Sequence, residues 1–340
     1  MKDSPNLDLL RAIAVALVVA SHVVLISGVD CAWYDLHTMG RIGVALFFVH
    51  TTLVLMASLE RHRESAIQFF VRRFFRIYPL SIAAVVFIAM LQMVGGVPIN
   101  AGQLVSNLLL VQNVTGYDST PSPLWTLPYE IQMYLVLPAV FMISRTQRPV
   151  QWTLLLLAAS VVAAEALGAK MDPPMGTGAK LVRFVPCFLP GLLAFVLPRR
   201  TASPWALFSV VSASIVVVPA LVAAGFSELH SMWVICLCVG MTIPACREIT
   251  SIPLARSAKL VATYSYGVYV THDFAIGVLA GGGLLPGPWY VQWGAFLILL
   301  PGLAYIAYHG IEKRGIAVGN RVALSLSSKQ TPPALLSQAR

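Results

Sequence analysis

The amino-acid sequence alternates between long apolar runs and short polar segments. The first run, from Leu7 to Gly28, is long enough to cross a bilayer as a helix. Similar runs recur to the end of the chain, so the pattern predicts an all-α, polytopic transmembrane helix bundle. The expected spans are 7–28, 40–59, 80–97, 125–143, 152–167, 180–197, 205–224, 229–246, 259–279 and 289–309.

Two segments next to these spans have other expected structures. The longest polar segment between spans, 98–123, contains an apolar stretch too short to cross the membrane, so it is expected to be interfacial or re-entrant. Glu312, with the two basic residues after it, is expected to end the last helix at the cytoplasmic surface. The transmembrane domain is therefore predicted over 1–322, and the polar, proline-containing residues 323–340 are predicted to form a disordered cytoplasmic tail.

Composition supports a membrane protein. Of 340 residues, 58% are hydrophobic and 11% are charged, and the mean hydropathy is +0.78. These values exclude an ordinary soluble domain. The net charge of +9 would suit nucleic acid, but the basic residues form short clusters between apolar runs, where membrane orientation accounts for them. We expect the lipid bilayer as a partner and no nucleic acid.

The distribution of positive charge predicts the orientation of the chain. When the expected spans are laid out in order, most of the 23 lysines and arginines lie on the side of the N-terminus. Arg11 lies within the first span, and the opposite side has only Arg41, Lys170, Lys180 and Arg183. Since cytoplasmic loops are enriched in Lys and Arg, both termini are predicted to be cytoplasmic. The five cysteines lack the paired spacing of a zinc site, so they are expected to fill apolar space, and no metal site is predicted.

The first apolar run also carries charged and ionisable groups. Arg11 and His22 are eleven positions apart, so on a helix they share one face at a separation of roughly 16 Å along the axis. Because intramembrane charges usually face a protein interior or a wet cavity, this face is expected to line a site.

A second basic group follows the second span. Arg72, Arg73 and Arg76 alternate with phenylalanines, as in a helix lying along the membrane surface, and this helix is expected to turn inward at Pro79. Guanidinium groups suit phosphate, and a buried neutral histidine such as His22 suits proton abstraction. Together they indicate a phosphorylated donor held from the cytoplasm with its reactive end near a base. Acyl-CoA is one donor of this kind.

Several sequence blocks, in order, resemble the acyltransferase 3 family of integral membrane O-acyltransferases, which modify bacterial envelope glycans. The blocks are LDLLRAIAVALVVASH, GVALFFV, RRFFRIYPL, PLWTLPYEIQMYLVLP, SYGVYVTH and HGIEKR, and they cover nearly the whole chain. The resemblance implies a helical bundle in the bacterial inner membrane. It also implies an acyltransferase that moves acetyl or another short acyl group from acyl-CoA to a hydroxyl of a cell-envelope or exported glycan, without a bound cofactor.

The resemblance also assigns expected roles to individual residues. It implicates His22 and Glu130 in catalysis, with Glu130 orienting His22 or the acceptor. Donor binding is expected of Arg11, Arg72, Arg73 and Arg76, and contact with the acceptor or support of the base is expected of Gln132, Tyr134, Tyr269 and His272. The chain departs from the family pattern at Leu9, at Ala45 and from His50 to Thr52, which bears on acceptor and acyl specificity.

Alternative interpretations remain open at this point. Arg11 alone would also fit a side chain that snorkels to the headgroups, and His22 would fit a hydrogen bond between helices. The arginine cluster would also serve as a cytoplasmic anchor. A carboxylate such as that of Glu130 would cost little free energy if it lay at the membrane interface. For the whole chain, the main alternative is a transporter or flippase for a glycan or other anion, and a weaker one is a structural subunit of an export complex.

Overall fold

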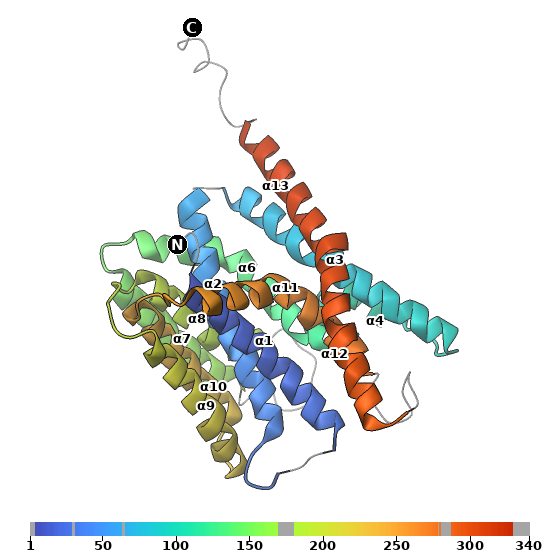
Figure 1. The fold of residues 1–340 in the computed structure, drawn as a ribbon. Helices are drawn as coiled ribbons and strands as arrows, with labels where there is room; N and C mark the ends of the chain where they lie inside the picture. Colours follow the sequence, from blue (N-terminus) through green and yellow to red (C-terminus); the bar gives the residue numbers. More distant parts are fainter. Residues whose placement is uncertain are drawn as a thin grey trace.

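The computed structural model describes residues 4–28, 31–62, 65–168, 180–277, 279 and 287–328. It is 84% helical, and its described residues contain no β-strand, which confirms the predicted all-α polytopic bundle (Figure 1). The α-helices are α1 Pro5–Ile26, α2 Leu36–His62, α3 Ala66–Val94, α4 Ala101–Leu108, α5 Gln112–Thr115, α6 Leu127–Phe141, α7 Pro149–Gly168, α8 Lys180–Val196, α9 Trp205–Ala223, α10 Glu228–Ala245, α11 Ile252–Ile276, α12 Trp289–Ile306 and α13 Lys313–Ser328. Two 3₁₀ segments, η1 Ser122–Thr126 and η2 Met142–Arg145, and one π-helical segment, η3 Ala307–Glu312, complete the described elements.

Helices occupy all ten predicted span positions. Within the described residues, eight helical segments are long and apolar enough to cross a membrane, and they contain α1, α2, α3, α6, α7, α9, α10 and α12. The remaining two positions are taken by the shorter apolar α8 and by α11, which carries several charged residues. The orientation of the termini stays a prediction.

The start of α1 is fixed to a distant loop. Ser4 caps the helix, and its hydroxyl accepts a hydrogen bond from the Leu7 amide. The Asn6 side chain donates to the Arg247 carbonyl at 2.9 Å and accepts from the Ile249 amide at 3.0 Å. These bonds cap α1 and tie its first turn to the loop before α11, and α1 packs against both α2 and α11.

The deeply buried α2 packs against α1, α8 and α10 at the centre of the bundle. Glycines permit the closest approaches. A Cβ atom added to Gly191 of α8 would lie 2.4 Å from the Val49 carbonyl oxygen, and one on Gly240 of α10 would lie 2.5 Å from the Pro190 carbonyl oxygen. Small residues at such crossings let helix backbones approach each other, as is common in membranes.

The predicted inward turn at Pro79 is wrong, because α3 continues through this residue to Val94. Proline has no N–H to bond the carbonyl four residues earlier, which belongs to Phe75. Helix α13 packs along α3 at this point, and Gly315 lies so close that an added Cβ would be 2.4 Å from the Phe75 carbonyl oxygen. Tertiary packing therefore supports the helix across the proline.

The predicted end of the last helix at Glu312 is also wrong. The helix continues through η3 into α13 and reaches Ser328, beyond the expected start of the tail at residue 323 (Figure 1). Ala323 is fully buried, and its carbonyl accepts a 3.0 Å hydrogen bond from Gln68 Nε2 of α3. Packing on α3 thus extends the helix, and residues 329–340 lie outside the described residues.

We predict that Gly191→Ala destabilises the bundle by about 1–3 kcal/mol, the usual cost of overpacking a core. The new methyl group would meet backbone atoms of α2, which have little room to move. Thermal unfolding of the detergent-purified protein measures the effect. Gly302→Ala in α12 is the matched control, because no atom lies within 4 Å of its added Cβ. Equal unfolding temperatures for the two variants would contradict the proposed close packing.

Candidate functional site

Two cavities within the bundle share a wall that contains Val44 of α2 and Tyr269 of α11. One has a volume of about 420 Å³ and is called here the arginine cavity. The other has a volume of about 870 Å³ and is called the His22 cavity. The Tyr269 hydroxyl is fixed in this wall by a 2.6 Å hydrogen bond with Thr126 Oγ1 and by donation to the Pro123 carbonyl.

The arginine cavity gathers side chains from helices far apart in the sequence. Among its lining residues are Arg11, His50, Arg61, Arg72, Arg73, Arg76, Glu130, Tyr134 and Asn320. All four arginines expected to bind a donor are therefore in one cavity. The cationic groups outnumber the single carboxylate in this lining, so the cavity favours an anion.

Neighbouring groups hold these arginines in place. Arg11 Nε donates to Ser265 Oγ at 2.5 Å, and Arg72 Nη1 donates to Asn320 Oδ1 at 2.9 Å. The Arg73 guanidinium lies 5.8 Å from the centre of the Phe69 ring, a cation–π distance. These contacts orient the guanidinium groups of Arg11, Arg72 and Arg73 within the cavity.

Glu312, which was expected to end the last helix at the cytoplasmic surface, is a buried acid. Its side chain is only 1% exposed, and its Oε1 lies 3.5 Å from Arg76 Nη2. In the described part of the chain, neither carboxylate oxygen has a hydrogen-bond partner. Glu312 ends the π-helical turn η3, a rare geometry that often marks functional positions. An isolated acid directly after a long apolar run was the signal that could have identified it.

Glu130 lies in the arginine cavity and not in the cavity that His22 lines. It accepts a hydrogen bond from the Tyr134 hydroxyl, one helical turn away, and Thr51 Oγ1 lies 3.5 Å from its Oε1. The geometry therefore does not support the hypothesis that Glu130 orients His22. His50, one of the departures from the family pattern, also lines this cavity and is 5% exposed.

The His22 cavity has a mixed polar and aromatic lining. It includes His22, His37, Arg41, Gln112, Asn113, Tyr117, Asp118, Ser119, Trp125, Tyr129, Arg183 and Glu228. Gln112 is almost completely buried, and its Oε1 has no hydrogen-bond partner among the described residues. Gln132 is not in the lining but holds Asn113 through a reciprocal amide pair at 3.0 and 3.1 Å. Amides, hydroxyls and aromatic rings of this kind suit a ligand rich in hydroxyl groups.

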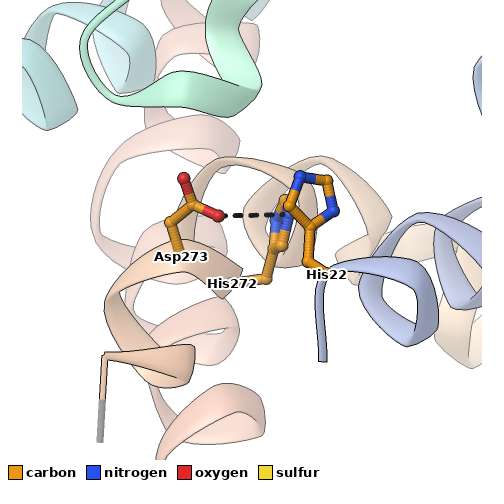
Figure 2. A group of neighbouring side chains, drawn as sticks. All are labelled: His22, His272 and Asp273. Atoms are coloured by element: carbon orange, nitrogen blue, oxygen red, sulfur yellow. Dashed lines mark ion pairs between the residues drawn. The ribbon is translucent and has the colours of Figure 1, made fainter. Parts of the chain in front are cut away.

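His22 projects from α1 with one ring nitrogen already engaged. Its Nδ1 lies 2.8 Å from the Val18 carbonyl oxygen. Because a carbonyl oxygen only accepts, Nδ1 carries the proton, and the lone pair of the neutral ring is on Nε2. Figure 2 shows the ring beside His272 and Asp273 of α11. His22 is therefore able to accept a proton through Nε2.

The arrangement suits a reaction between two ligands. An anionic group would bind in the arginine cavity, and a hydroxyl-bearing ligand would bind beside a potential base on the other side of the Tyr269 wall. Arg11 and His22 share α1, so the helix itself sets the distance between the two functions.

Comparisons with known proteins agree with this chemistry. The family model described as "Acyltransferase domain", that of the acyltransferase 3 family, matches residues 4–309. "Acyltransferase MdmB" of Streptomyces mycarofaciens is 28% identical, with 80% of this chain and 79% of that protein aligned. "Peptidoglycan O-acetyltransferase OatA" of Listeria monocytogenes is 32% identical, but the alignment covers 42% of this chain and 25% of that protein.

No solved structure matches the chain. The family match, in contrast, extends through nearly every helix that lines the two cavities. This chain therefore belongs to the acyltransferase 3 family, and the resemblance seen in its sequence blocks is confirmed.

Proposed function

We propose that this protein is a multi-pass O-acyltransferase of the bacterial inner membrane. It moves an acetyl or other short acyl group from acyl-CoA to a hydroxyl of an envelope or exported glycan, and residues 1–322 form its acyltransferase domain. The observation that carries the proposal is the pair of cavities that meet at Tyr269, one rich in arginine and the other lined by His22.

The arginine cavity is the proposed donor site. CoA is a polyanion because of its phosphates, and guanidinium groups bind phosphate through bidentate, charge-assisted hydrogen bonds. Arg72, Arg73 and Arg76 would hold these phosphates, with Arg11 deeper in the bundle. The remaining arm of CoA is flexible and uncharged, so it suits passage along the apolar wall near Val44 toward His22.

His22 is the proposed general base. Its Nε2 would take the proton of the acceptor hydroxyl while the hydroxyl oxygen forms its bond to the thioester carbon. The carbon–sulfur bond then breaks, and the proton passes to the departing thiolate to give the free thiol of CoA. No other reactant is needed for this exchange.

The His22 cavity is the proposed acceptor site. Sugars present several hydroxyl groups to amides and an apolar ring face to aromatic side chains. Gln112 Oε1 is buried and has no hydrogen-bond partner among the described residues, so it would gain from a hydroxyl donor, which supports binding of a sugar here. The name of the Listeria relative specifies peptidoglycan, which supports a glycan acceptor for this chain.

We expect purified His22→Ala to bind acetyl-CoA like the wild type but to release thiol about 10²- to 10⁴-fold more slowly, the usual contribution of a general base. Isothermal titration measures binding, and a thiol-reactive dye follows turnover with water as the surrogate acceptor. A wild-type rate in His22→Ala would rule out this role. If the wild type consumes no short acyl-CoA but moves a glycan across vesicles, the transporter alternative is the better description.

We expect Arg76→Gln to weaken acetyl-CoA binding by at least roughly tenfold, because a hydrogen bond to a charged group contributes about 1.5–3 kcal/mol. The same titration measures this loss, which should decrease as salt screens the charges. Arg199→Gln is the matched control, since Arg199 is a half-exposed arginine outside the cavity, 3.8 Å from Glu248. Equal affinities for both variants would contradict a donor site in the arginine cavity.

A further inference from the structure

Three ionisable side chains lie close together between α1 and α11 (Figure 2). They are His22, His272 and Asp273, and one nitrogen or oxygen atom from each lies within 4.8 Å of the others. His272 is completely buried, and Asp273 is 27% exposed. His272 was expected only to contact the acceptor or support the base, and Asp273 had no expected role.

Backbone carbonyls fix the protonation pattern of both histidines. His272 Nδ1 lies 2.7 Å from the Tyr269 carbonyl oxygen, as His22 Nδ1 lies 2.8 Å from that of Val18. Both Nδ1 atoms therefore carry protons, and both neutral rings have their lone pairs on Nε2. The rings contact each other edge to face, with their centres 4.9 Å apart.

The second ring nitrogen of His272, Nε2, is in an unfavourable environment. It is buried without a hydrogen-bond partner in the described residues, and the nearest ionic group is Asp273 Oδ1 at 3.6 Å. A lone pair that faces a carboxylate is unfavourable unless a positive charge lies nearby. The cluster thus has two nitrogen lone pairs and a carboxylate placed to stabilise one added proton.

A metal ion is the other charge that such a cluster would attract. Ligands bound tetrahedrally at about 2.0–2.2 Å from zinc lie roughly 3.4 Å from one another. The atoms of the present group are up to 4.8 Å apart, so zinc would require them to move closer together. The arrangement favours a proton, which one nitrogen holds while the other groups stabilise it from a distance.

We propose that His272 and Asp273 are positioning residues for His22, which hold its ring in place and stabilise its protonated form during acyl transfer. This inference rests on the proposed function. In the step concerned, the acceptor O–H bond breaks, the proton moves to His22 Nε2 and the new oxygen–carbon bond forms. When the carbon–sulfur bond breaks, the proton returns to the thiolate, and the cluster regains its neutral histidines.

The test compares Asp273→Asn, His272→Gln and Asp273→Glu with the wild type, using acetyl-CoA as the probe. Removal of either partner is expected to lower the rate of thiol release about 10- to 100-fold, as for other groups that orient functional histidines. Acetyl-CoA affinity should stay close to that of the wild type, because the CoA phosphates are proposed to bind in the arginine cavity and neither His272 nor Asp273 lines it. Asp273→Glu, which keeps the charge, should recover part of the rate. Unchanged affinity also shows that each variant is folded.

The matched controls are His230→Gln and Glu165→Gln. They alter another histidine–carboxylate pair, which joins α10 to α7 outside both cavities. Wild-type rates are expected for these controls. A rate loss as large as that of Asp273→Asn would show a general structural effect and overturn the proposal.

Two further outcomes separate this inference from the proposed function. If His22→Ala is inactive while His272→Gln and Asp273→Asn turn over like the wild type, the positioning role falls and the transferase remains. If His22→Ala keeps the wild-type rate, both fall. Elemental mass spectrometry tests a third outcome. If the wild type contains one equivalent of metal and His272→Gln has lost it, the cluster holds a metal ion and not a proton, which would overturn the proposal.

Discussion

The cost of placing arginine inside an apolar bundle constrains the rest of this structure. A charge at membrane depth is tolerated only where water, a ligand or a counter-charge reaches it. The arginine cavity supplies the space, and Glu312 supplies a buried counter-charge 3.5 Å from Arg76. Ser265 and Asn320 satisfy donors of Arg11 and Arg72. Buried charges therefore require this cavity, because they need space for water or a ligand, and the packing of the helices leaves that space open.

Close helix packing provides the rigid frame that these charges require. In a membrane, helix association relies on van der Waals contact, so positions without a side chain have a large effect. Gly191 brings α8 against α2, and Gly315 brings α13 against the carbonyl that Pro79 leaves without its helical donor. The second contact also carries Asn320 of α13 to Arg72. The contact between α13 and α3 therefore supports α3 at Pro79 and completes the lining of the arginine cavity.

The sequence predicted features that repeat along a helix better than features that depend on distant partners. The eleven-residue spacing of Arg11 and His22 placed them on one face, and each does line a cavity. Glu312 escaped recognition because its partner, Arg76, is on another helix far away in the sequence. The separation of Glu130 from His22 was not predictable, because it depends on how the segment from α5 to η1, between two predicted spans, folds into the lining of the His22 cavity. Local pattern could not show that α3 continues through Pro79, since α13 stabilises it there.

The separation of the arginines from His22 has an electrostatic consequence. A base must become positively charged when it takes a proton, and nearby cations oppose this. At an effective dielectric constant of 20, two unit charges repel by about 4 kcal/mol at 4 Å but by about 1 kcal/mol at the roughly 16 Å set by the spacing on α1. The distance between Arg11 and His22 therefore lets one helix serve both a polyanion site and a proton acceptor. His272 and Asp273 lie next to His22, close enough to stabilise the positive charge that its ring gains with the proton.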